Sequence, residues 1–91
     1  MRPDLSEAYA ALREEIVRAR KRVGVSQSEV ADVLGAHQQF WSKVESGERR
    51  LDIVELVAVA GKLQLSVTRL VKRLREELDK NGGGDSGVPP E

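Results

Sequence analysis

The sequence predicts a small all-helical domain with five helices. Hydrophobic residues recur at spacings of three and four in five separate segments, and no segment shows the two-residue alternation of a strand. Serine or aspartate stands at a capping position before most of these segments, and glycine follows three of them. With 91 residues, the chain has room for one modest core but not for a separate sensor or catalytic domain.

The first helix is expected to run from Asp4 or Ser6 to about Val23. Asp4 has Glu7 three residues later, which is the spacing of a capping box, and Gly24 favours a helix end. The apolar residues of this helix repeat on one face and are expected to be buried: Leu5, Tyr9, Leu12, Ile16 and Ala19.

Two short helices are expected in close succession. Ser26 is placed to cap the first of them, with Glu29 at the capping-box position, and Gly35 to end it. The second covers about Gln38 to Glu45 and ends at Gly47. Only three residues separate the two helices, which suits a sharp turn with glycine at positive φ.

Two further helices complete the predicted domain. Asp52 is placed to cap the fourth helix, with Glu55 at the capping-box position, and this helix runs to about Lys62. Ser66 is placed to cap the fifth, at about 67–79. The apolar stripe of the fifth helix consists of Val67, Leu70, Val71, Leu74 and Leu78.

The composition excludes several classes of protein. The chain has no cysteine and a single histidine, so we expect no disulfide, metal or cofactor. No nucleophile–base pair is recognisable, and the only glycine run, at 82–84, does not lie between a strand and a helix, so we expect no enzyme. There is no apolar run of a signal peptide and none of about 20 residues for a membrane span, so we expect a soluble cytoplasmic protein.

The charge distribution neither supports nor excludes nucleic-acid binding. The formal net charge is zero. The predicted domain, 1–80, carries fifteen basic and thirteen acidic residues, and the remaining segment, 81–91, has the composition of a disordered tail. A surplus of two positive charges is a weak field, so any expectation of DNA binding must come from a motif.

The third predicted helix has one polar and one apolar face. At 100° per residue, four polar side chains share an arc of about 140°: Gln38, Gln39, Ser42 and Lys43. Phe40, Trp41 and Val44 lie on the opposite side. Glutamine pairs bidentately with adenine, lysine contacts guanine, and serine bonds to several base edges. The polar face therefore has the side chains that major-groove contacts require.

The run SQSEVADVLGAHQQFWSKVESGERRLD resembles the helix-turn-helix of the Cro and phage-repressor family, often called XRE-like. Gln27 opens the motif, Ala31 matches the small residue where its helices cross, and Gly35 matches the turn glycine. Glu45 and Gly47 match the E-x-G ending of the family. The buried apolar positions are matched by Val30, Leu34, Ala36, Trp41 and Val44. The motif spans 27–46, and residues 16–70 fit the five-helix, lambda-repressor-like domain of the family.

The resemblance implies a role for each matching position. Base contacts in the major groove would come from Gln38, Gln39, Ser42 and Lys43. Phosphate contacts would come from Gln27, Arg49 and Arg50. Arg20 and Glu45 would form the partly buried ion pair that the family keeps between its first and third helices.

Two positions depart from the family pattern. His37 stands where the family has Ser, Thr or Pro, which predicts a weaker cap for the third helix. Trp41 is larger than the usual Ile or Val, so the interior must be repacked around it. Phe40 borders the polar arc; it could contact a thymine methyl group, but packing in the core or an interface is the favoured interpretation.

The fifth helix carries more apolar surface than a compact domain needs. Val71, Leu74 and Leu78 extend its stripe and are expected to form a homodimer interface. The alternative is that the stripe packs back along the N-terminal half of the first helix, which carries Leu5, Tyr9 and Leu12.

Together these features predict a regulator of transcription that binds double-stranded DNA sequence-specifically. We expect a repressor that binds a two-fold symmetric operator as a homodimer. An antitoxin, with a toxin as its protein partner, or a restriction–modification controller would have the same sequence features. The neutral net charge leaves a further alternative, a helical protein-interaction module that has lost DNA binding.

Overall fold

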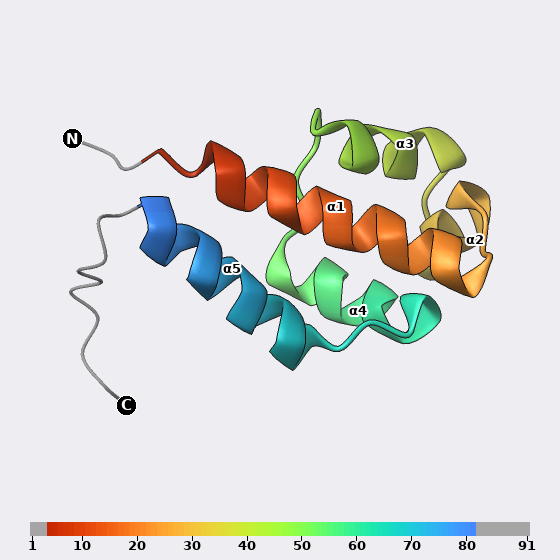
Figure 1. Ribbon diagram of the computed structural model, residues 1–91. Coiled ribbons are helices and arrows are strands. Elements are labelled where there is room, and N and C mark those ends of the chain that lie inside the picture. Colours follow the sequence, from red (N-terminus) through yellow and green to blue (C-terminus); the bar gives the residue numbers. More distant parts are fainter. Residues whose placement is uncertain (1–3, 82–91) are drawn as a thin grey trace.

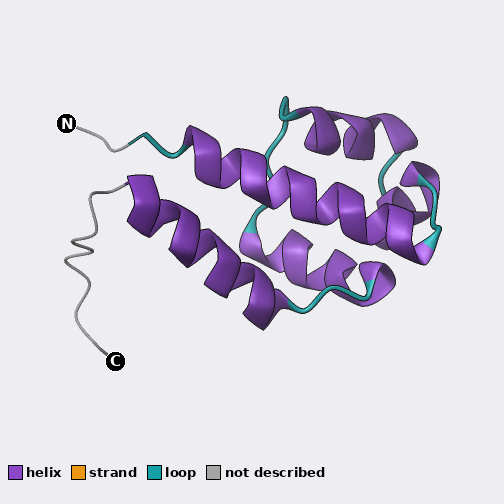
Figure 2. Ribbon diagram, in the orientation of Figure 1, coloured by secondary structure: helices purple, strands orange, loops and turns teal. Residues whose placement is uncertain are grey.

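The computed structural model describes residues 4–81, which form five helices and no strand (Figure 1). In chain order the helices are α1 (Ser6–Val23), α2 (Gln27–Val33), α3 (Gln38–Ser46), α4 (Ile53–Leu63) and α5 (Val67–Asn81). Short loops join them, drawn in teal in Figure 2. The all-helical, five-helix prediction is confirmed. Asn81, assigned to the tail, ends α5, and the rest of the expected tail, 82–91, lies outside the described residues.

Two helices begin with the capping boxes that the sequence predicts. The Ser26 hydroxyl accepts the backbone N–H of Glu29 at 3.0 Å, and the Glu29 carboxylate accepts the backbone N–H of Ser26 at 2.9 Å. Asp52 and Glu55 repeat this exchange at the start of α4, at 2.7 and 3.0 Å. Each box satisfies N–H groups that an uncapped helix leaves without partners, so the starts of α2 and α4 are set locally.

The first helix starts differently from the prediction. The residue before α1 is Leu5, and no side chain caps the helix. The Asp4 carboxylate accepts the backbone N–H of Ser6 at 2.9 Å. A capping box from Asp4 would need the N–H of Glu7 and a helix that starts one residue earlier, so that prediction was wrong.

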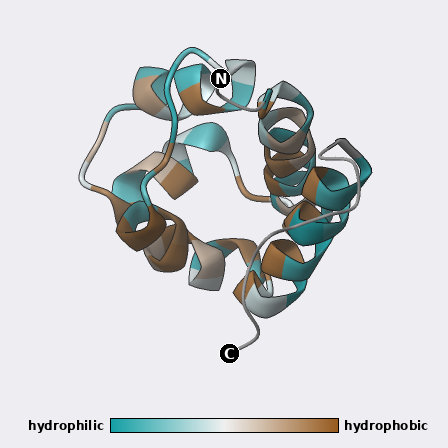
Figure 3. Cartoon of the chain, turned by 90° about the vertical axis from the view of Figure 1, so that its left-hand side faces the viewer, coloured by the Kyte–Doolittle hydropathy of each residue, from teal (hydrophilic) through white to brown (hydrophobic). Residues whose placement is uncertain are grey.

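The core lies between α1 and the other helices. Figure 1 shows α1 crossing the middle of the domain, with α3 on one side and α4 and α5 on the other. Brown and teal segments alternate along the helices in Figure 3, as expected of amphipathic helices around a shared core. The largest fully buried side chains are Trp41, Ile16, Leu63, Val30 and Val59.

The buried face of α1 is shifted from the expected one. Ile16 and Ala19 are buried as expected, but Leu5 is 40% exposed because it precedes the helix. Ala11 is also buried, although it was not among the residues predicted to be buried. The main buried cluster therefore combines the C-terminal half of α1 with residues from each of the other four helices.

α5 lies beside the N-terminal half of α1 (Figure 1). Leu74 and Leu78 are half-buried there, and an apolar groove of about 200 Å³ between the two helices is lined by Leu5, Ala8, Tyr9, Leu12, Leu74 and Leu78. Arg73 of α5 also pairs with Glu15 of α1. This is the alternative arrangement stated above, in which the stripe packs back along the first helix. Of the three residues expected in a dimer interface, only Val71 is largely exposed, at 54%.

None of the helices in the described part of the chain is both long and apolar enough to cross a membrane.

Candidate nucleic-acid interface

The polar arc of α3 lies on the surface of the domain. Gln38, Gln39 and Lys43 are exposed and Ser42 is partly exposed, whereas Trp41 is fully buried on the opposite side. Because buried apolar residues hold the inner face of α3 against α1, the position of its outer side chains relative to the domain is fixed.

The first turn of α3 is held without a side-chain cap. His37 precedes the helix in an extended conformation, with φ −80° and ψ 159°, and its imidazole makes no capping hydrogen bond. Its backbone carbonyl accepts the N–H of Phe40 at 2.9 Å. The helix therefore starts with the weaker cap that was predicted from His37, since only the backbone of this residue takes part.

An ion pair joins α1 to the end of α3. Arg20 Nε donates to Glu45 Oε2 at 2.6 Å, and a second guanidinium nitrogen donates to Glu45 Oε1 at 3.2 Å. The side chains of Arg20 and Glu45 are only 14% and 10% exposed. Arg20 also donates to the carbonyl of Val25 at 3.0 Å, which ties the pair to the loop before α2. A bidentate contact of this kind restrains both distance and orientation.

Glu45 accepts two further hydrogen bonds. The indole N–H of Trp41 donates to Glu45 Oε2 at 2.7 Å, and the side-chain amide of Gln27 donates to Glu45 Oε1 at 2.9 Å. Trp41 and Glu45 stand four residues apart on one helix, so their side chains share a face. The larger side chain at position 41 therefore brings a donor for the carboxylate as well as more buried surface.

The balance of these contacts keeps Glu45 ionised. Burial by itself would raise the pKa of this carboxyl group. The hydrogen bonds from Arg20, Gln27 and Trp41, together with the positive charge of Arg20, outweigh burial and hold the pKa below its usual range. The buried carboxylate thus has donors on both oxygens, as a buried charge requires.

The arrangement of α2, a tight turn through Gly35 at φ 65°, and α3 is the geometry of a helix-turn-helix. A family model described as helix-turn-helix matches residues 16–70, which is more than half of the chain and contains both helices. The chain belongs to the helix-turn-helix family of Cro and the phage repressors. Members of this family are DNA-binding regulators. No curated protein and no solved structure matches the chain.

Within this helix-turn-helix protein, Gln27 of α2 bridges Gln38 at the start of α3 and Glu45 near its end. Gln38 Nε2 donates to Gln27 Oε1 at 2.6 Å, while the Gln27 amide nitrogen donates to Glu45. Glutamine has one carbonyl oxygen and two N–H groups, so Gln38 keeps one acceptor and one donor for a ligand. The family resemblance implies a phosphate contact for Gln27; in the structure its amide lies between the side chains of Gln38 and Glu45, both on α3.

Arg49 makes contacts within the chain. Two of its guanidinium nitrogens donate to the Glu55 carboxylate at 2.7 and 3.1 Å, and one also donates to the carbonyl of Arg50 at 2.6 Å. The hydrogen bond from Arg49 and that from the backbone of Asp52 lower the pKa of Glu55. Arg49 thus ties the loop after α3 to the cap of α4. The six-residue separation across a loop gave no sequence signal for this pair.

Phe40 packs against the core, and the Arg49 guanidinium lies over its ring at 4.3 Å from the ring centre. Of the two roles considered for Phe40, the structure therefore shows the packing role.

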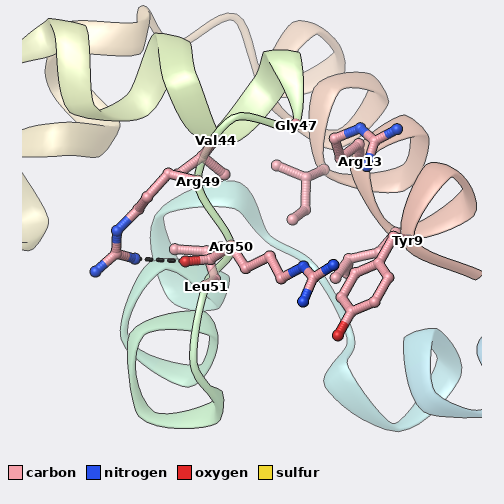
Figure 4. Close-up of a pocket in the computed structure, with 9 residues that line it drawn as sticks. Tyr9, Arg13, Val44, Gly47, Arg49, Arg50 and Leu51 are labelled. Carbon is pink, nitrogen blue, oxygen red and sulfur yellow. Dashed lines mark hydrogen bonds between the residues drawn. The ribbon is translucent and has the colours of Figure 1, made fainter. Parts of the chain in front are cut away.

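Three arginine side chains, Arg13, Arg49 and Arg50, lie near the end of α3 (Figure 4). The Arg50 guanidinium lies over the Tyr9 ring at 4.1 Å, which ties the loop after α3 to α1. The Arg13 side chain lies against Gly47, where an added Cβ would come within 3.1 Å of the guanidinium. Between them is a cavity of about 20 Å³, which is room for about one water molecule. Arg13 belongs to this cationic cluster, and no pattern in the sequence had indicated it.

Proposed function

We propose that the protein is a cytoplasmic, sequence-specific transcriptional repressor that binds a two-fold symmetric operator as a homodimer. The observation that carries this proposal is the series of hydrogen-bonded side chains from the partly buried pair Arg20–Glu45 through Gln27 to Gln38, on the exposed face of α3, which we propose as the recognition helix. A polar side chain held in place before binding loses less conformational entropy in the complex.

The exposed face of α3 supplies the base contacts. Gln38 retains one donor and one acceptor, which is the pattern that adenine N7 and N6 require for a bidentate contact. Gln39 and Ser42 lie on the same arc, and the ammonium group of Lys43 is suited to guanine N7 and O6. These four residues would determine the operator sequence.

The flanks of α3 supply the phosphate contacts. Gln27 uses one N–H for Glu45 and has a second for a phosphate oxygen. Arg50 carries its charge on the surface beside the end of α3. Arg49 is proposed to act through Arg50, since it holds the carbonyl of that residue in place. Such contacts orient the protein on the duplex without specifying sequence.

Selection from a random duplex library tests the proposal. We expect enrichment of a two-fold symmetric sequence with the wild-type protein. The Gln38→Ala variant should lose the base preference at one position of each half-site. Lys72→Ala, at an exposed position of α5, is the matched control and should retain that preference. If no sequence is enriched, and random duplexes do not bind at low salt, the protein is an interaction module rather than a repressor.

A further inference from the structure

The outward face of α4 is apolar although it is exposed. The inner face of this helix packs in the core through Leu56, Val59, Ala60 and Leu63. On the outside, Ile53, Val54 and Val57 are 62%, 74% and 56% exposed. A third of the residues in the chain are charged, yet within α4 only Glu55 and Lys62 are, and Glu55 is engaged by Arg49.

Apart from Ile53, the exposed apolar residues of α4 form one continuous stripe. At 100° per residue, an arc of about 100° opposite the buried side contains Val54, Val57, Ala58 and Gly61, which we call the α4 face. A helix that is apolar on both sides is normally covered on both sides. The described part of the chain covers only one of them.

Gly61 is the second observation. It lies inside α4, where glycine is less favourable than alanine, and a Cβ added to it would meet nothing within 4 Å. The packing of the single chain therefore gives no reason for a glycine at this position. A small residue on an exposed apolar stripe permits close approach by another helix.

We propose that the α4 faces of two copies pack against each other, antiparallel, about a two-fold axis between Val57 and Ala58. In this register Val54 of one copy lies opposite Gly61 of the other, and Val57 lies opposite Ala58. Each large side chain thus faces a small one, and the face is complementary to itself, as a two-fold interface requires. This interface is independent of the proposed function, because α3 and α4 lie on opposite sides of α1 (Figure 1) and the α4 face is remote from the proposed DNA-binding face.

Charge supports a second copy as the partner, in antiparallel orientation. Asp52 caps the start of α4 and Lys62 lies near its end, and both are exposed. Antiparallel packing opposes the two helix dipoles and brings the end of α4 that carries Asp52 to the end of the partner helix that carries Lys62. Parallel packing would place like charges together. The α4 face itself has no charge with which to select an acidic or basic partner.

The α5 stripe is the competing interface, and it offers less free surface. Leu74 and Leu78 already pack against α1, which leaves Val71 as its largely exposed apolar residue. A dimer through α5 would thus have one well-exposed apolar anchor per copy, whereas the α4 face has two valines and a glycine for close approach.

Disulfide cross-linking tests both the interface and its register, because the chain has no cysteine of its own. Positions 54 and 61 are seven residues apart, or about 10 Å along the helix, so a Val54→Cys, Gly61→Cys double variant cannot form a bond within one chain. In the proposed dimer these cysteines meet between chains. Each single variant would place its two cysteines at opposite ends of the helix pair.

We expect the double variant to form a covalent dimer under mild oxidation, whereas either single variant and Val71→Cys remain monomeric on a denaturing gel. Efficient cross-linking through Val71→Cys instead would assign the interface to α5 and overturn the proposal. Cross-linking by a single variant at position 54 or 61 as efficient as by the double variant would overturn the antiparallel register.

Sedimentation equilibrium without DNA provides a second test. Val57→Glu should raise the dimer dissociation constant about 100-fold, because two unpaired carboxylates would be buried at the axis. Val33→Glu, at an exposed valine on α2, is the matched control and should leave the constant unchanged. A wild-type protein that is monomeric at several hundred micromolar overturns the α4 interface even if it binds DNA. A dimer of the proposed register that binds no duplex supports the interface and overturns the proposed function.

Discussion

Gln38 Nε2 donates a hydrogen bond of 2.6 Å to Gln27 Oε1, so a residue at the start of α2 holds a residue at the start of the recognition helix. Gln27 is held in turn by the carboxylate of Glu45. The outermost side chain of this series is exposed, and the innermost lies beside the core. Any change in the buried pair is therefore expected to alter the orientation of Gln38 as well as the stability of the fold.

Replacing Gln38 by alanine should weaken operator binding by about 1–3 kcal/mol, the usual value of one bidentate base contact. Gln39→Ala should also weaken operator binding while the fold stays intact. Fluorescence anisotropy titrations with operator and scrambled duplexes would measure both effects, and binding to the scrambled duplex should hardly change. Operator binding equal to that of wild type in both variants would mean that these amides do not contact bases.

Gln27→Ala should affect specificity without removing a base contact. The substitution deletes the partner of Gln38 and one donor to Glu45, so Gln38 becomes free to adopt other rotamers. We expect weaker operator binding and a smaller ratio between operator and scrambled DNA. A variant that lost affinity equally for both duplexes would show that Gln27 acts only on the phosphate backbone.

Glu45→Ala should lower the free energy of unfolding by about 3 kcal/mol, because it leaves the Arg20 guanidinium buried without its partner. The double variant Arg20→Leu, Glu45→Leu should lose less, since no uncompensated charge remains. Urea denaturation followed by circular dichroism would give the three values. A denaturation midpoint for Glu45→Ala close to that of wild type would contradict a stabilising pair.

The same carboxylate predicts a dependence on pH. The pKa of Glu45 is lower in the folded protein than its ordinary value of 4.5. Its ionisation therefore adds stability that is complete above about pH 5 and is lost as the pH falls through the folded-state pKa. Glu45→Gln should be less stable than wild type at pH 7, and the difference should shrink below pH 4. A difference that did not change between pH 7 and pH 3 would contradict this origin.

Much of the fold follows from short-range signals in the sequence. The capping boxes at Ser26 and Asp52 depend on a residue and its third neighbour, so the starts of α2 and α4 were predicted correctly. The helix-turn-helix resemblance identified the partners Arg20 and Glu45, which no local spacing relates. The donation from Trp41 to Glu45 was missed, although their four-residue spacing on one helix face would have indicated it.

Contacts across loops were not predictable in this way. Arg49 and Glu55 stand on either side of the loop between α3 and α4, and their pairing depends on the path of that loop, which no residue spacing indicates. The apolar stripe of α5 predicted that Leu74 would be buried, but it did not indicate which surface would bury it. A stripe specifies a buried face, and the choice between α1 and a second copy depends on the tertiary path of the chain.

Trp41→Phe should keep most of the core volume but remove the indole donor to Glu45. The loss of a hydrogen bond to a charged acceptor is expected to cost about 1.5–3 kcal/mol. Circular dichroism must be the measurement, because this is the only tryptophan in the chain. In a double-mutant cycle with Glu45→Ala, the two effects should not be additive. Additive effects would show that the indole stabilises the protein by packing alone.

The salt dependence of binding should distinguish the two arginines after the recognition helix. Lys43 and Arg50 are the exposed cations on the proposed interface, so a dimer displaces counterions from about four phosphates, and the slope of log K against log salt should be about −4. Arg50→Ala removes two of these contacts from a dimer and should flatten the slope by about two units. Arg49 is paired with Glu55, so Arg49→Ala should change the slope by less than about half a unit.

Arg49→Ala should act on the loop instead, because it releases the Arg50 carbonyl and the Glu55 carboxylate. We expect a lower denaturation midpoint for Arg49→Ala. The control Lys72→Ala, at an exposed position of α5, should have the midpoint of wild type. Titrations of operator and scrambled duplexes from low to moderate salt would give the slopes for each variant. If Arg49→Ala flattened the slope as much as Arg50→Ala, the Glu55 pair would have to open on DNA and Arg49 would itself contact phosphate. A wild-type slope shallower than about −2 would show that this face does not bind the phosphate backbone, which would contradict the repressor proposal.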